Sequence, residues 1–172
     1  MFLLKFFISY KKSQGYTLIE LLVAVIIVGI LSAIAIPSFF NQVNKARQSE
    51  AIQLNSHVLK AERGYYLENG RFTDDWAELN LGAAKKTNNY TQDLIALNAD
   101  NGGIRTLLIS FEPRYPALKS YVGAITINLD TNEFFVQLCE AIQPGTNQIK
   151  FEEVKVKPRK IRCPENTNSV LP

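Results

Sequence analysis

Residues that serve enzymes as nucleophiles, bases and metal ligands are scarce in this chain. His57 is the only histidine in 172 residues, and its place in a segment with helical periodicity favours a surface or interface role over that of a base. The chain has no Gly-x-Ser-x-Gly elbow and no phosphate-binding glycine loop. The acidic pair Asp74-Asp75 is better explained as the start of a short helix than as a metal site. We therefore expect no enzyme, no metal site and no cofactor.

The chain also lacks a net charge once residues 1–15 are set aside. The formal net charge of +3 comes from 19 Lys+Arg against 16 Asp+Glu, and the three excess cations are Lys5, Lys11 and Lys12. Without residues 1–15, the side-chain charges of the chain balance. The basic isoelectric point of about 8.8 is therefore no argument for a nucleic-acid partner.

What the chain does have is one long apolar run, from Leu18 to Phe40. At a helical rise of about 1.5 Å per residue, this run crosses a hydrocarbon core of about 30 Å. Its only charged side chain is Glu20. A carboxylate near the centre of such a span costs roughly 2.5–3.5 kcal/mol, and less near an end. We expect the partner of this carboxylate to lie outside the single molecule.

The residues around this acid, Gly15-Tyr16-Thr17-Leu18-Ile19-Glu20-Leu21-Leu22-Val23, resemble the processing site of type IV prepilins and type II secretion pseudopilins. The resemblance implies that a prepilin peptidase/methyltransferase cuts after Gly15 and methylates the new N-terminus at Tyr16, where the family commonly has Phe. It also implies that Glu20 pairs with the N-terminal ammonium of a neighbouring subunit.

The same resemblance places Gly29 and Pro37 where the family helix loosens during assembly. A harmless kink is the other interpretation of Pro37, because membrane helices tolerate proline.

A rival targeting signal is also present, since Ser32-Ala33-Ile34-Ala35 has an A-x-A pattern after an apolar core. Cutting after Ala35 would release a soluble protein, but the apolar run continues through Phe40 and Glu20 would spoil the core of such a signal.

Helical periodicity continues beyond the apolar run and predicts an amphipathic second half of the helix. The apolar positions between residues 41 and 66 are Val43, Ala46, Ala51, Ile52, Leu54, Val58, Leu59, Ala61, Tyr65 and Tyr66. Asn69-Gly70 predicts the end of the helix. A short helix capped by Thr73 is expected next.

Strands are predicted at Thr106–Phe111, Tyr121–Leu129, Phe134–Cys139 and Ile149–Val156. Asp130-Thr131-Asn132 predicts a hairpin turn, and residues 158–172 are expected to form a loop. The expected fold is α+β, with the long N-terminal helix packed on a four-stranded antiparallel sheet, which is also the pilin head fold. Three regions follow: a leader at 1–15, a membrane and assembly half of the helix at 16–40, and a head at 41–172.

A second resemblance concerns the head. The run from Leu67 to Trp76, the tripeptide Tyr121-Val122-Gly123 and the loop after Cys139 look like the cyanobacterial branch of pilin-like proteins.

The only cysteines are Cys139 and Cys163, and an oxidising compartment outside the membrane favours a disulfide between them. Two unpaired buried thiols are the alternative.

A basic tract near the C-terminus has five cations and no acid: Lys155, Lys157, Arg159, Lys160 and Arg162. The tract is a candidate contact for anions, such as DNA or an anionic surface. The alternative is a solvated edge strand, since lysines also deter pairing between sheet edges.

Together these features predict a structural subunit of a type IV pilus or related surface filament. The alternatives are a minor pilin, a type II secretion pseudopilin, or a pilin at the filament tip that binds DNA or a surface. The expected partners are the prepilin peptidase/methyltransferase, other copies of the chain and other pilins. We expect the precursor in the inner membrane with its N-terminus in the cytoplasm, and the assembled protein in a surface filament or the periplasm.

Overall fold

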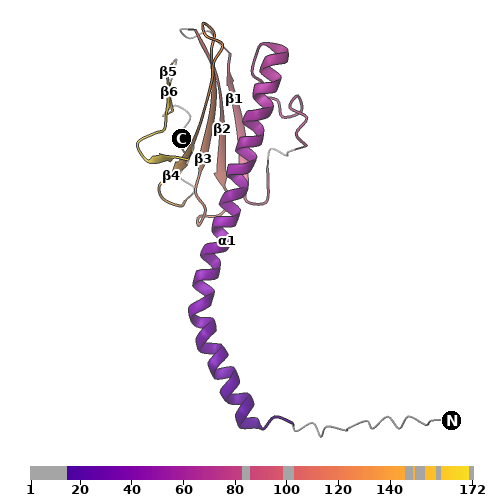
Figure 1. The fold of residues 1–172 in the computed structure, drawn as a ribbon, viewed down its shortest axis with the longest axis vertical. Helices are drawn as coiled ribbons and strands as arrows, with labels where there is room; N and C mark the ends of the chain where they lie inside the picture. The colour runs from indigo at the N-terminus through magenta and orange to yellow at the C-terminus, as the bar shows by residue number, and fades with distance from the viewer. Residues whose placement is uncertain are drawn as a thin grey trace, which may run out of the picture. The chain divides into compact units, whose positions relative to one another are not determined.

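The computed structural model describes residues 15–82, 86–98, 103–145, 149, 154–157 and 160–170, without the side chains of 155–157 and 160. The chain divides into two compact units, Met1–Asn41 and Gln42–Pro172. Helix α1 runs from Leu18 to Asn69, so it begins in the first unit and ends in the second (Figure 1).

In the first unit, the apolar side chains of α1 lie in solvent. Leu18 is 82% exposed, Ile34 74% and Phe40 60%, so no other part of the described chain covers them. By length and composition, α1 is the one helix among the described residues that could cross a membrane. A helix that is apolar all round is stable only when lipid or other protein surrounds it.

In the second unit, α1 packs on a sheet through one buried stripe. The buried positions recur at helical spacing: Ala51, Asn55, Val58, Leu59, Glu62 and Tyr66. The predicted amphipathic helix is confirmed, but the stripe includes two polar residues, Asn55 and Glu62, that hydrophobic periodicity does not reveal. The helix ends as predicted, because Gly70 takes a left-handed conformation with φ of +67°.

The sheet is antiparallel and has five strands in the order β1-β2-β3-β4-β7. The bounds are β1 Tyr90–Leu97, β2 Ile104–Pro113, β3 Tyr121–Asn128, β4 Phe134–Ala141 and β7 Thr167–Ser169. One face packs on α1 through a core that includes Tyr90, Ile109, Phe111, Tyr121, Ile125 and Leu138. The turn between β3 and β4 follows the prediction: the Asn128 carboxamide oxygen accepts N–H bonds from Asp130 at 2.9 Å and Thr131 at 3.2 Å.

The other face of the sheet is covered in part by the C-terminal residues. A second cluster joins Leu108, Val122 and Ala124 of the sheet with Ile149, Val154 and Ile161. Strands β5 (Lys155–Lys157) and β6 (Lys160–Arg162) form a separate two-stranded sheet. The head therefore has a helix on one face and a short hairpin on the other.

The α+β prediction is confirmed, but the expectation of four strands in the sheet was wrong. Strand β1 was missed, and the expected C-terminal loop contains β6 and β7. The strand predicted at Ile149–Val156 is found, in the described residues, as β5 at Lys155–Lys157 in the small second sheet.

The expected short helix capped by Thr73 is instead a series of turns at residues 76–80. No helix follows Thr73 among the described residues. Its hydroxyl donates a hydrogen bond to Glu78 at 2.6 Å. Asn80 ends the turns with φ of 48°.

Candidate functional site

The N-terminal end of α1 is closed by a reciprocal hydrogen-bond pair. The backbone N–H and the hydroxyl of Thr17 both donate to Oε2 of Glu20, at 2.8 and 2.9 Å. In return, the N–H of Glu20 donates to the Thr17 hydroxyl oxygen at 3.3 Å. This is a capping box, which satisfies helix N–H groups that have no partner inside the helix.

The capping box gives Glu20 a contact within its own chain, which sequence reasoning missed. The signal was present, because Thr17 followed three positions later by Glu20 and an apolar run is the sequence pattern of such a box. Gly15 and Tyr16 precede the helix and are exposed, with Tyr16 at 88%. The peptide bond between them is therefore accessible in the described chain.

The two residues expected to loosen the helix both lie inside α1. Pro37 cannot donate a backbone hydrogen bond, so the helix lacks one bond there. A Cβ atom built at Gly29 would have no neighbour within 4 Å outside the helix backbone. Packing within the single chain therefore does not require glycine at this position.

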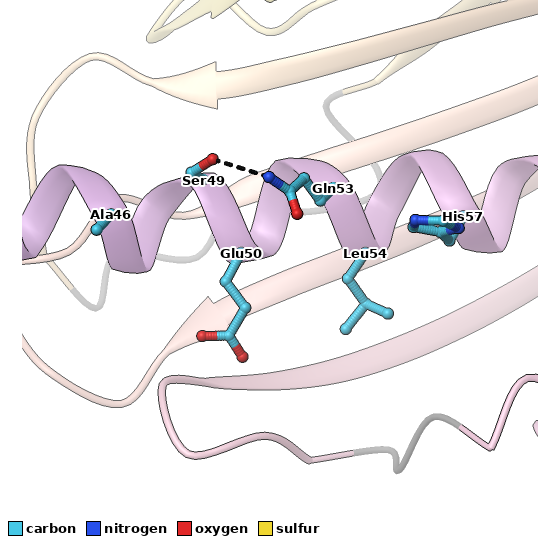
Figure 2. Close-up of a pocket in the computed structure, with 6 residues that line it drawn as sticks. All are labelled: Ala46, Ser49, Glu50, Gln53, Leu54 and His57. Atoms are coloured by element: carbon cyan, nitrogen blue, oxygen red, sulfur yellow. Dashed lines mark hydrogen bonds between the residues drawn. The ribbon is translucent and has the colours of Figure 1, made fainter.

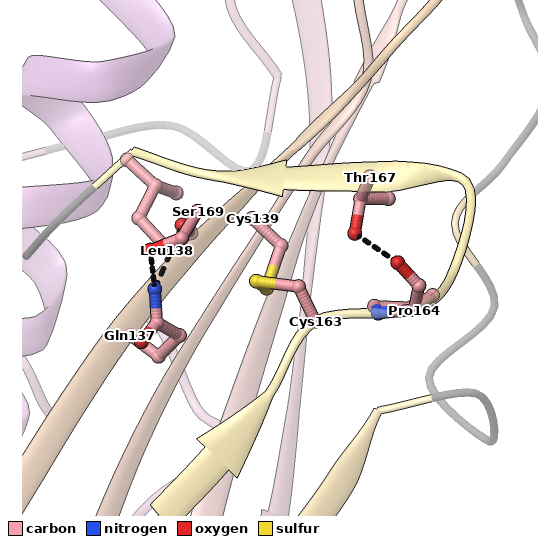
Figure 3. Close-up of a disulfide and its surroundings, with 7 residues drawn as sticks. All are labelled: Gln137, Leu138, Cys139, Cys163, Pro164, Thr167 and Ser169. Carbon is pink, nitrogen blue, oxygen red and sulfur yellow. Dashed lines mark hydrogen bonds between the residues drawn. A yellow bond between two sulfur atoms is a disulfide. The ribbon is translucent and has the colours of Figure 1, made fainter.

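Cys139 and Cys163 form a disulfide with a Cα–Cα distance of 5.5 Å (Figure 3). Cys139 lies on β4 and is 1% exposed, while Cys163 directly follows β6. The bond thus joins the C-terminal hairpin to the main sheet. Next to it, β7 pairs with β4, with Ser169 opposite Cys139.

Four of the five cations of the basic tract lie on the hairpin of β5 and β6. Lys155 pairs with Arg162, and Lys157 pairs with Lys160. Because residues that pair directly share one face of a sheet, these four positions share a face, opposite to that of Val156 and Ile161. Arg159 lies outside the described residues.

A surface hollow of about 450 Å³ follows α1 (Figure 2). It is lined by Ala46, Ser49, Glu50, Gln53, Leu54 and His57. Three of its polar residues have partners: Gln53 donates to the Ser49 hydroxyl at 3.4 Å, and Glu50 accepts from Asn89 at 2.5 Å. The described residues contain no group of three or more His, Cys, Asp or Glu that could hold a metal ion.

An exposed apolar helix half that begins with a capped acid, joined to a head in which the same helix packs on an antiparallel sheet, defines the class of pilin-like proteins. Residues 48–164 match the family model of type IV pilin-like G and H, described as putative. Residues 10–36 match the prokaryotic N-terminal methylation motif. The chain therefore belongs to the type IV pilin-like G and H family.

Curated relatives agree with this assignment. The chain is 35% identical over 89 residues to the type IV major pilin protein PilA of Myxococcus xanthus (52% of this chain, 40% of the relative). It is 33% identical over 96 residues to the fimbrial protein EcpC of Eikenella corrodens (56% and 62%). It is 41% identical over 70 residues to the type IV major pilin protein PilE1 of Neisseria gonorrhoeae (41% and 40%).

These matches span 40% to 62% of the relatives' own length. No solved structure matches the chain.

Proposed function

We propose that this chain is a structural subunit of a type IV pilus or related surface filament. The observation that carries the proposal is the apolar half of α1, which is exposed along its length in the single chain and starts within a methylation motif. Such a surface is stable in a bilayer or against other copies of the same helix. The subunit needs no enzymatic chemistry for this role.

In this proposal, the precursor is held in the inner membrane with its N-terminus in the cytoplasm. The prepilin peptidase/methyltransferase cuts after Gly15 and methylates Tyr16. The new ammonium of each subunit pairs with Glu20 of its neighbour, and the subunits pack helix to helix in a filament. The loss of a backbone bond at Pro37, together with Gly29, allows the helix to stretch as it packs.

Pairing with a neighbour is favoured because both charges are costly when they are alone in a medium of low dielectric constant. Cleavage creates the ammonium, so pairing becomes available only after the leader has been removed. This order keeps uncut precursors in the membrane and out of the filament.

Mass spectrometry of sheared surface filaments tests the proposal. We expect this chain in the preparation, with methylated Tyr16 as its first residue. A product that begins at Ile36 and is found free in solution would instead establish the secretory cut after Ala35. The amount of the chain decides between a shaft subunit and the alternatives, because a shaft subunit dominates the filament whereas a minor pilin or a secretion pseudopilin does not.

A second candidate function is contact of the head with a polyanion. The observation that favours it is the register of the C-terminal hairpin, which pairs Lys155 with Arg162 and Lys157 with Lys160. Cations directly opposite one another repel, and a polyanion relieves that repulsion. For duplex DNA, four phosphate contacts predict that log K falls with log salt concentration at a slope near −3.6. Charge reversal at Lys157 and Lys160 should abolish the retention of DNA, while filaments still form.

A further inference from the structure

Glu62 is a carboxylate in the middle of the buried stripe of α1. Its side chain is 0% exposed. Oε2 accepts a hydrogen bond from the backbone N–H of Thr73 at 3.3 Å, while Oε1 has no partner among the described residues. A buried carboxyl with one donor is poorly placed to remain ionised, because burial disfavours the charged form.

The charged groups around Glu62 add to this effect. Burial is the main cause that raises its pKa to about 7, and the N–H of Thr73 acts in the opposite direction. The carboxylates of Asp74 and Glu78 raise the pKa further, and the Arg71 guanidinium lowers it.

A further cation lies at this end of the helix. The Arg105 guanidinium of β2 donates to the Tyr66 hydroxyl and to the carbonyl of Gly70. Its bonds go to these oxygens, so the Glu62 carboxyl gains no hydrogen bond from it.

The segment Arg71–Asn80 follows α1 and lies against it. Two hydrogen bonds of 2.9 Å between Phe72 and Asn98 fix its start. The Phe72 N–H donates to Oδ1 of Asn98, and Nδ2 of Asn98 donates to the Phe72 carbonyl. Farther along, Glu78 accepts bonds of 2.6 Å from Tyr65 of α1 and from Thr73. The bond from Thr73 to Glu62 directly follows the first anchor, so it is the contact at which the start of the segment meets the buried stripe.

We propose that Glu62 controls, by gaining or losing a proton, how closely the segment Arg71–Asn80 lies against α1. When the carboxyl is protonated, two negative charges remain near the contact and the segment lies close. When it ionises, a third carboxylate is added beside Asp74 and Glu78, and hydrating it requires the segment to move away from the helix. The surface that the head presents near residues 71–80 therefore changes with the acidity of the surroundings.

The chain contains its own reporter for this change, because Trp76 is the only tryptophan and lies in the segment, partly packed against the core. Acrylamide quenching of Trp76 is measured on the full-length chain in detergent micelles from about pH 5 to about pH 9. We expect quenching to rise with pH, with a midpoint near 7, the value to which burial raises the pKa of Glu62.

Variants assign the transition to this carboxyl. Glu62→Gln keeps the shape of the side chain without its charge, so quenching should stay low at every pH. Glu68→Gln removes an exposed carboxylate of the same helix and should leave the transition intact. His57→Gln should also leave it intact, which excludes the only histidine as its source.

Two further variants should move the midpoint in opposite directions. Asp74→Asn removes a repelling charge and should lower the midpoint, whereas Arg71→Gln removes an attracting charge and should raise it. The proposal is overturned if quenching in the unaltered chain is constant across the range, or if Glu62→Gln retains the transition. Should Glu62→Gln fail to fold, an Asp74→Asn midpoint equal to that of the unaltered chain also overturns it.

Discussion

Replacing Gly123 with alanine should destabilise the head, because α1 approaches β3 closely at this point. A Cβ atom at Gly123 would lie 2.2 Å from Oδ1, 2.4 Å from Nδ2 and 2.7 Å from Cγ of Asn55. Asn55 is 0% exposed, so its amide has no solvent to turn into, and the helix must shift instead. Overpacking of this kind costs typically about 1–3 kcal/mol, and we expect a loss in that range.

The loss should depend on Asn55. In the described chain, neither amide atom of Asn55 has a hydrogen-bond partner, so Asn55→Ala removes the clashing atoms without breaking a hydrogen bond. In the Asn55→Ala background, Gly123→Ala should therefore be nearly neutral. The coupling energy of the double-mutant cycle should equal most of the single-variant loss.

Urea unfolding of the full-length chain in detergent micelles, followed by the fluorescence of Trp76, measures all four free energies. Gly64→Ala is the matched control, because a Cβ atom there meets nothing within 4 Å. Alanine in place of a helical glycine should stabilise by up to about 1 kcal/mol. An equal cost of Gly123→Ala with and without the Asn55 amide would refute the clash between these two residues as the source of the loss.

Four other outcomes can be checked. Gly15→Val should leave an uncut precursor in the membrane, visible as a larger band on immunoblots; normal processing would contradict the cleavage site. Glu20→Ala and Glu20→Gln should both be processed but give few sheared filaments, and an unchanged yield would make the charge incidental. Cys139→Ser should lower the free energy of unfolding by roughly 3–4 kcal/mol, the entropic value for closing a loop of about 25 residues; a reducing agent should have the same effect on the unaltered chain but none on the variant. Burial raises the pKa of Glu62 from 4.5 to about 7, so the folded state binds the Glu62 proton more tightly than the unfolded state does. The free energy of unfolding should therefore fall by up to about 3 kcal/mol between about pH 4.5 and 7 and level off above. Glu62→Gln should remove that fall in urea unfolding measured across the range.

The long helix and the central strands could be predicted because each has a strong local signal. The strand β3, Tyr121–Asn128, is buried at every position, and its apolar run is plain in the sequence. Strand β1 was missed because its inward positions include Gln92, which is 0% exposed, so apolar and polar residues do not alternate cleanly. Strand β7 pairs over only three residues, which is too short for a periodic signal.

The turns at residues 76–80 were mistaken for a helix for a different reason. Thr73 followed by acids is a common helix start, but tertiary contacts use the same groups. The N–H of Thr73 donates to buried Glu62, and its hydroxyl donates to Glu78. The Asp75 carboxylate accepts a hydrogen bond from the N–H of Ala77. A buried acid on another element therefore decided the local structure, and no pattern within the segment could reveal it.

The capping box raises the question of whether Glu20 still needs a neighbour. A cap of this kind contributes typically about 1 kcal/mol, whereas a carboxylate costs roughly 2.5–3.5 kcal/mol at the membrane centre and less near an end. The cap therefore offsets only part of the cost, unless Glu20 lies near the surface of the bilayer.

The proposed pairing of Glu20 with a neighbouring ammonium does not compete with the cap for the same oxygen. Both bonds from Thr17 end on Oε2, and in the described part of the chain Oε1 accepts no hydrogen bond, so an incoming ammonium can bind without opening the cap. Glutamine can form the same kind of box but has no charge. Glu20→Gln therefore separates the two contributions: if it assembles as the unaltered chain does, the cap is the function of this residue, and if it fails as Glu20→Ala does, the charge is.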